Sequence, residues 1–163
     1  MCCHRLTKNN IIFMIPKQLL LQANPNSYSP VTPSAPGDTE YQHEVDLSRE
    51  VLYQAQTAHG HFEPYLGVLE NQNLPTLSVS DSEMALLGSS LSRSGFDLVR
   101  TRYHSMRRWV CPSTVRQPHD RCEWALGVVG SRAFWVHERL SMVPLVDMIN
   151  RNVTENAEVG LGI

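Results

Sequence analysis

Proline spacing near the N-terminus constrains this chain more than any other feature. The segment from Asn24 to Gly37 reads NPNSYSPVTPSAPG and contains four prolines. Each proline fixes φ and removes an amide donor, so neither a helix nor a central strand can pass through it. We therefore predict an extended N-terminal arm over residues 1–45, an α+β domain over residues 46–155 and a flexible tail over residues 156–163.

The apolar content is sufficient for one folded domain. Hydrophobic residues make up 42% of the 163 positions, which excludes disorder of the whole chain. The longest early apolar run is broken at Pro16, so it is too short for a transmembrane helix and is a poor secretory signal. We therefore predict a cytoplasmic protein without a membrane partner. Its four cysteines are expected to be reduced thiols, although the spacing of Cys111 and Cys122 permits a disulfide.

Two helices carry recognisable start signals. Asp46 is a suitable N-cap for an amphipathic segment, which predicts a helix over residues 47–58. Ser80 and Glu83 have the spacing of a capping box, in which each residue satisfies an amide of the other. That pair predicts a helix over residues 81–93, and Ser94-Gly95 is expected to end it.

Strand signals occupy much of the remaining domain. We predict a short strand over residues 74–79 and a second over residues 96–106, which is rich in aromatic and β-branched residues. A β-hairpin is predicted from residues 122–128 and 133–139 around Gly130, and a final helix follows Pro144. Without a regular βαβ order, these elements indicate a single α+β domain. It has about three helices and a small, mainly antiparallel sheet, preceded by an irregular Pro-rich arm.

Charge is distributed unevenly along the chain. Residues 38–83 contain nine acidic residues and one arginine. Residues 93–121 contain seven arginines, two acidic residues and several aromatic residues. Arginine next to aromatic residues is suited to phosphate contacts and base stacking. The residues that we predict to bind a partner or nucleic acid are Arg100, Arg102, Tyr103, Arg107, Arg108, Trp109 and Arg116.

Three interpretations of these arginines remain open. On a strand, Arg100, Arg102 and His104 would share one face and could follow a phosphate backbone. The same surface could bind an acidic protein instead. The arginines could also pair with the acidic half of the same domain, because no helix-turn-helix, RNA-recognition or zinc-finger pattern supports nucleic acid in particular.

Metal binding is an alternative with its own residues. His59, His61 and Glu63 would share one face of an extended segment and could hold zinc or iron. A weaker set combines Cys111 and Cys122 with His104 and His119, but its spacing matches no common zinc site.

The function predicted from sequence follows from these observations. The chain has no phosphate loop, nucleophile elbow or calcium loop. We predict a non-enzymatic binding or assembly module without a cofactor, whose Arg-rich region 93–121 engages an acidic protein or nucleic acid. Its N-terminal arm would contact a second subunit in a homo-oligomer. The alternative is a small metal-dependent enzyme centred on His59, His61 and Glu63.

Overall fold

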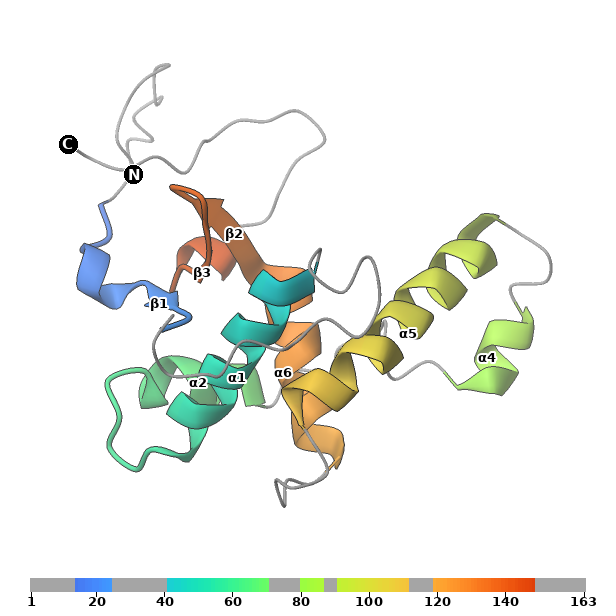
Figure 1. Cartoon of the computed structure of the whole chain (residues 1–163), viewed down its shortest axis with the longest axis horizontal. Helices are drawn as coiled ribbons and strands as arrows, with labels where there is room; N and C mark the ends of the chain where they lie inside the picture. The colour runs from blue at the N-terminus through green and yellow to red at the C-terminus, as the bar shows by residue number, and fades with distance from the viewer. Residues whose placement is uncertain (1–13, 25–40, 71–79, 87–90, 112–118, 149–163) are drawn as a thin grey trace, which may run out of the picture.

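The chain folds as an α+β domain, seen in a computed structural model that describes residues 14–24, 41–70, 80–86, 91–111 and 119–148 (Figure 1). The α-helices are α1 (Gln42–Gln56), α2 (Glu63–Glu70), α4 (Asp81–Leu86), α5 (Leu91–Val110) and α6 (His119–Arg132). The strands are β1 (Leu21–Gln22), β2 (Ala133–Val136) and β3 (Arg139–Met142), and the 3-10 turns are η1 (Lys17–Leu19) and η3 (Val146–Met148). The predicted fold class is confirmed, with more helix than expected.

The three strands form one antiparallel sheet in the order β1-β3-β2. β1 comes from the predicted N-terminal arm, and Leu21 lies opposite Met142 of β3. The hairpin turn between β2 and β3 is made by His137 and Glu138, whose φ angles are 43° and 59°. Positive φ at both central residues is typical of a type I′ turn, which matches the twist of the two strands. Part of the predicted arm is therefore a strand of the domain.

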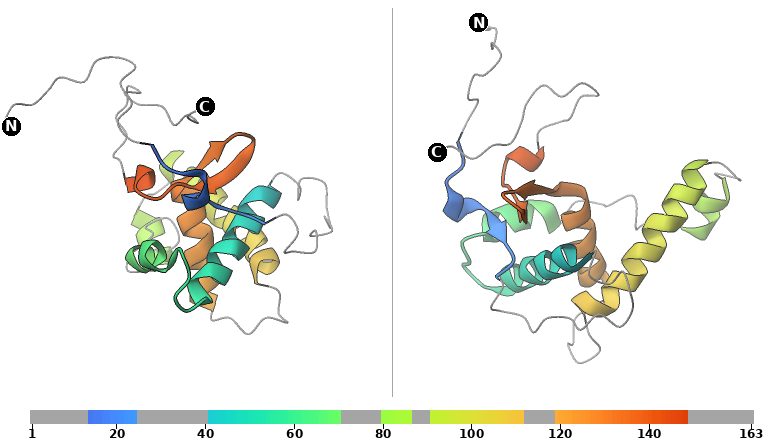
Figure 2. Two further views of the ribbon diagram at one scale, coloured as in Figure 1. Left: turned by 90° about the vertical axis from the view of Figure 1, so that its left-hand side faces the viewer. Right: turned by 45° about the horizontal axis from the view of Figure 1, so that its top comes forward.

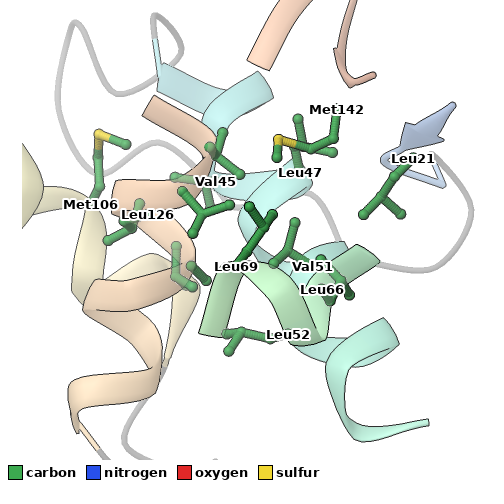
Figure 3. Packing of buried hydrophobic residues seen from close by; sticks show 14 residues of the cluster. Leu21, Val45, Leu47, Val51, Leu52, Leu66, Leu69, Met106, Leu126 and Met142 are labelled. Atoms are coloured by element: carbon green, nitrogen blue, oxygen red, sulfur yellow. The ribbon is translucent and has the colours of Figure 1, made fainter. Parts of the chain in front are cut away.

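The core lies where α1, α2 and α6 meet the sheet (Figure 3). α1 packs along α6 and also contacts α2, α5, β1 and β3. Its buried side chains follow the helical period and include Leu47 and Val51, both at 0% exposure. Leucine, valine and methionine side chains from the other elements surround them: Leu21, Leu66, Leu69, Met106, Leu126, Val128, Val129 and Met142.

The predicted first helix is confirmed, but it begins earlier than the sequence indicated. α1 starts at Gln42 after Tyr41, whose side chain makes no capping hydrogen bond. Asp46 is therefore inside the helix, where its Oδ1 accepts a hydrogen bond from Gln42 Nε2 at 2.7 Å. Burial of Val45 in the core extends the helix toward its N-terminus, because packing of an apolar face stabilises a turn that lacks a cap.

The strand predicted over residues 96–106 is wrong, because this segment belongs to α5. Its apolar residues are spaced alternately by three and four, which is the helical period: Phe96, Val99, Tyr103, Met106 and Val110. Met106 and Val110 are buried in the contacts of α5 with α1 and α6. Aromatic and β-branched residues fit either structure when packing decides. The expected stop at Ser94-Gly95 is also wrong, because α5 runs through both residues. An added Cβ at Gly95 would meet nothing within 4 Å, so no close contact requires a glycine there.

The first strand of the predicted hairpin is also wrong. Residues 122–128 lie in α6, and the buried residues Cys122, Ala125 and Val129 recur at helical spacing. Gly130, which was expected in the hairpin turn, is in the last turns of the same helix. The hairpin is displaced toward the C-terminus, where His137-Glu138 lacks the usual Asn-Gly or Asp-Gly turn signal.

The capping box at Ser80 is confirmed. Glu83 N donates to Ser80 Oγ at 3.3 Å, and Ser80 N donates to Glu83 Oε2 at 2.8 Å. The Ser80 hydroxyl also donates to Glu83 Oε2 at 2.7 Å, and this hydrogen bond, followed by the one from the Ser80 amide, lowers the pKa of the Glu83 carboxyl. The strand predicted over residues 74–79 lies outside the described residues. Of the helix expected after Pro144, the described residues contain the 3-10 turn η3.

One pair of helices extends away from the rest of the domain. The first half of α5 reaches beyond α1 and α6, and α4 lies beside its far end (Figures 1 and 2). Within the ranges given above, no helix is both long and apolar enough to cross a bilayer.

Candidate functional site

The basic residues of α5 from Arg100 to Arg108 fall into two groups on the helix surface. Arg100, His104, Arg107 and Arg108 are spaced by four, three and one residues. At about 100° per residue, these four side chains cover one sector of the helix, beside its buried apolar side. We call this set the basic face of α5. His104 and Arg108 are exposed, and Arg100 and Arg107 are half-buried.

Arg102 does not belong to this set. A strand would have placed it beside Arg100, but two residues along a helix correspond to about 200°. Arg102 instead points to α1, where its Nη2 is paired with Glu44 Oε1. Its guanidinium lies 4.4 Å from the ring centre of Tyr41. The change from strand to helix therefore removes Arg102 from the predicted binding surface.

Internal ion pairs also engage two more of the arginines. Arg107 Nη1 lies 2.6 Å from Glu123 Oε1 on α6. Arg121 Nη1 is paired with Glu70 Oε1 on α2, and its guanidinium lies 5.5 Å from the ring centre of Trp124. The acidic half of the domain thus supplies counter-charges for Arg102 and Arg121. Internal pairing, one of the three interpretations of the sequence, accounts for part of the charge segregation.

A recess lies between α5 and α6 on the basic face. Arg100, Tyr103, His104, Arg107 and Glu123 line it, and its volume is about 160 Å³. This is smaller than the roughly 300 Å³ at which pockets for small molecules usually begin. We call it the α5–α6 recess. It has room for one polar group of a larger ligand.

Tyr103 forms one wall of the recess because α6 has a glycine opposite it. A Cβ at Gly130 would lie 1.8 Å from Tyr103 Oη, so a larger residue would displace the ring or its hydroxyl. Burial raises the pKa of Tyr103, the nearby charge of Glu44 raises it further, and Arg102 partly opposes both. Tyr103 therefore keeps its proton at neutral pH and can donate a hydrogen bond.

The C-terminal turn of α5 holds the remaining predicted residues. Arg108 has its guanidinium 5.0 Å from the ring centre of Trp109. Arg49 Nε of α1 donates to the Trp109 carbonyl at 2.9 Å, which places a positive charge at the C-terminal end of the helix dipole. Trp109 is thus half-buried against the core, and Arg108 is at the surface. Arg116 lies outside the described residues.

The residues of the predicted metal site are close in sequence, but they do not converge. His59, with φ of 59°, is 98% exposed, and its Nδ1 lies 3.8 Å from Glu63 Oε2. The ring of His61 instead meets Phe62 edge-on at 5.2 Å. Across the described parts of the chain, no three His, Cys, Asp or Glu side chains are arranged to hold a metal. The metal hypothesis continues to rest on sequence spacing.

Cys111 and Cys122 form a disulfide, so the expectation that both are reduced thiols is wrong. The bond joins the residue after α5 to the first turns of α6, where Cys122 is buried. The two helices meet along their apolar faces, and this brings together cysteines that are 11 residues apart. Neither sulfur is then a thiolate that could join His104 in a zinc site.

A buried polar network, which the sequence did not indicate, lies on the other side of α6. Asp147 has a side chain at 0% exposure, and its Oδ2 accepts a hydrogen bond from Tyr65 Oη at 2.7 Å. Arg132 Nη1 lies 3.4 Å from the same oxygen and donates to the Asp147 carbonyl at 3.2 Å. Burial, and then the hydrogen bond to Asp147, raise the pKa of Tyr65. No sequence signal connects these residues, because 82 positions separate Tyr65 from Asp147.

Comparisons with known proteins add no information on function. No family model matches this chain, and no curated protein or solved structure is significantly similar to it.

Proposed function

We propose that this protein is a non-enzymatic binding module, and that the basic face of α5 engages an acidic partner. Nucleic acid is the partner that we propose to test first. The observation that supports the proposal is the clustering of Arg100, His104, Arg107 and Arg108 on one side of α5. The first half of this helix extends from the domain (Figure 2). Helices of this kind present cations to a polyanion without a preformed cleft.

The spacing of the basic face agrees with a phosphate backbone. Arg100 and Arg108 are separated by about 12 Å along the axis, at 1.5 Å per residue. Phosphates on one DNA strand are about 3.4 Å apart along the duplex axis, so the face matches three or four of them. Arginine can hold a phosphate through two parallel hydrogen bonds, which gives each contact direction as well as charge.

Two further elements of the proposal concern assembly and location. The N-terminal arm would contact a second subunit. Its residues 14–24 already include β1, and residues 25–40 lie outside the described residues.

A cytoplasmic location is also proposed, and the Cys111–Cys122 disulfide bears directly on it. Disulfides persist mainly in oxidising compartments, so counting free thiols in protein isolated under alkylating conditions tests this part.

The test is fluorescence anisotropy with labelled duplex DNA, single-stranded DNA and RNA, at about 50 and 200 mM salt. The variant Arg100→Gln with Arg108→Gln removes two charges from the basic face. We expect it to weaken binding at least tenfold at low salt. It should also reduce the slope of log affinity against log salt by about two, one for each phosphate that is no longer neutralised.

The matched control is Lys17→Gln with Arg139→Gln, which removes the same charge from the exposed surfaces of η1 and β3. It should change affinity by less than about threefold, because it alters only long-range attraction. An equal loss in both variants would show that net charge, not the basic face, controls binding. If all three nucleic acids fail to bind but a polyglutamate peptide binds through Arg100 and Arg108, the partner is an acidic protein instead.

A further inference from the structure

We propose that the α5–α6 recess is a subsite for a single phosphate group, and that Glu123 pairs with Arg107 as an internal counter-ion when no phosphate is bound. The inference rests on the proposed function, because it assigns one defined contact within the basic face. The basis is the set of donors that line the recess, its size and the position of Glu123.

The lining residues supply donors from one side. Arg100, His104 and Arg107 are spaced by four and three residues, so they follow one another along α5 and face the recess together. Tyr103 lines the recess from the adjacent position of the same helix. A phosphate group has several oxygens that accept hydrogen bonds, and the paired N–H donors of a guanidinium group match its geometry.

The size of the recess limits what enters it. About 160 Å³ accommodates a compact tetrahedral anion but not a nucleoside, which needs a pocket of ordinary ligand size. The rest of a larger ligand would lie on the open side, toward the exposed Arg108. Both a phosphomonoester at a chain end and a phosphodiester within a chain share this chemistry.

Glu123 is the acidic residue among the described side chains that line the recess. Its Oε1 lies 2.6 Å from Arg107 Nη1, and its side chain is 36% exposed. Partial exposure allows the carboxylate to turn into solvent at small cost, because a surface ion pair of this kind contributes little. A phosphomonoester with nearly two negative charges, or a phosphodiester with one, would take its place on Arg107, although repulsion from Glu123 would still weaken binding.

The experiment titrates inorganic phosphate into the full chain and follows the arginine side-chain and His104 imidazole signals by NMR. In Glu123→Gln, the competing charge is removed, and we expect phosphate affinity to rise about three- to tenfold. Glu70→Gln is the matched control, since Glu70 pairs with Arg121 and is 37% exposed. It removes the same charge away from the recess and should leave phosphate affinity within about twofold.

Arg107→Gln should abolish the shifts at His104 while circular dichroism shows a folded protein. A second arm compares oligonucleotides with and without a 5′-phosphate. A preference for the phosphorylated end that disappears in Arg107→Gln assigns the subsite to a monoester, and equal binding that weakens in Arg107→Gln assigns it to the backbone diester.

The outcomes separate this inference from the proposed function. If inorganic phosphate leaves the recess signals unchanged in both the wild type and Glu123→Gln, the subsite is wrong, even if oligonucleotides still bind through Arg100 and Arg108. An equal gain in Glu70→Gln would also overturn it. If phosphate binds as expected while no oligonucleotide or acidic peptide binds, the subsite stands and the proposed function fails.

Discussion

Two regions of this domain use their side chains differently. The body consists of α1, α2, α6 and the three-stranded sheet, and it contains most of the buried leucine and valine residues (Figure 3). The projection consists of α4 and the first half of α5, and it exposes Leu86 and Leu98 (Figure 1). Met84 is the buried residue of α4. Stability therefore resides in the body and in the half of α5 that packs on it through Met106 and Val110, whereas the projection mostly faces solvent.

The difference follows from how many elements surround each side chain. A leucine between α1, α2 and the sheet is enclosed on every side, so its removal leaves a cavity. A leucine on the outside of a projecting helix has water as its neighbour in both the folded and unfolded states. Similar residues thus contribute very different free energies according to their place in the fold.

The largest expected effect is a loss of stability caused by a cavity in the body. Leu47→Ala should lower the free energy of unfolding by about 2 to 5 kcal/mol, because Leu47 is at 0% exposure in the core. Leu98→Ala, at 71% exposure, should change it by less than about 0.5 kcal/mol. Urea denaturation of both variants measures the two values. Similar losses would show that the projection is packed against something in solution.

The disulfide tests how the C-terminal end of α5 is joined to α6. The double variant Cys111→Ser with Cys122→Ala should destabilise the protein by about 3 kcal/mol. Without the disulfide, the unfolded chain is no longer closed into a loop between two residues 11 positions apart, so its conformational entropy increases. Amide hydrogen exchange should then increase more at the C-terminal turns of α5 than in α1. The single variants Cys2→Ser and Cys3→Ser are the controls for loss of a thiol. Unchanged unfolding in the double variant would show that the pair is not oxidised in solution.

The smallest expected effect concerns Tyr65 in α2 and Tyr103 in the half of α5 that packs on the body. Tyr65→Phe should cost about 1 to 3 kcal/mol at neutral pH, because the buried Asp147 Oδ2 loses its closer donor and is left with the longer contact from Arg132 Nη1 at 3.4 Å. Burial raises the pKa of both Tyr65 and Tyr103 above the ordinary value of 10.0. Above about pH 10, the unfolded state loses these protons first, so stability is complete below that pH and falls as pH rises.

Unfolding free energies at several alkaline pH values check this direction. The decline above pH 10 should be shallower in Tyr65→Phe and in Tyr103→Phe than in the wild type. Tyr53→Phe removes a phenol that is exposed on α1 and serves as the control. A decline of the same slope in all three variants would contradict the stated cause.

The sequence predicted those features that depend on neighbouring residues. The Ser80–Glu83 capping box needs only a short segment, and α1 has a single apolar stripe that agrees with its propensity. The α+β class and the concentration of arginine after residue 93 were also available from composition and order. For the candidate site, Arg100, Arg107 and Arg108 of the predicted set share one face of α5, and their role in binding stays a prediction.

Tertiary packing decided the rest. Residues 96–106 and 122–128 can form a strand or a helix by propensity, and their burial between α1, α5 and α6 selected the helix. That choice rotated Arg102 toward Glu44 and brought Arg107 to Glu123. The Cys111–Cys122 bond and the Tyr65–Asp147 hydrogen bond likewise depend on which helices lie side by side. Local sequence sets what a segment prefers, but only the apolar contacts between distant segments determine which side chains meet.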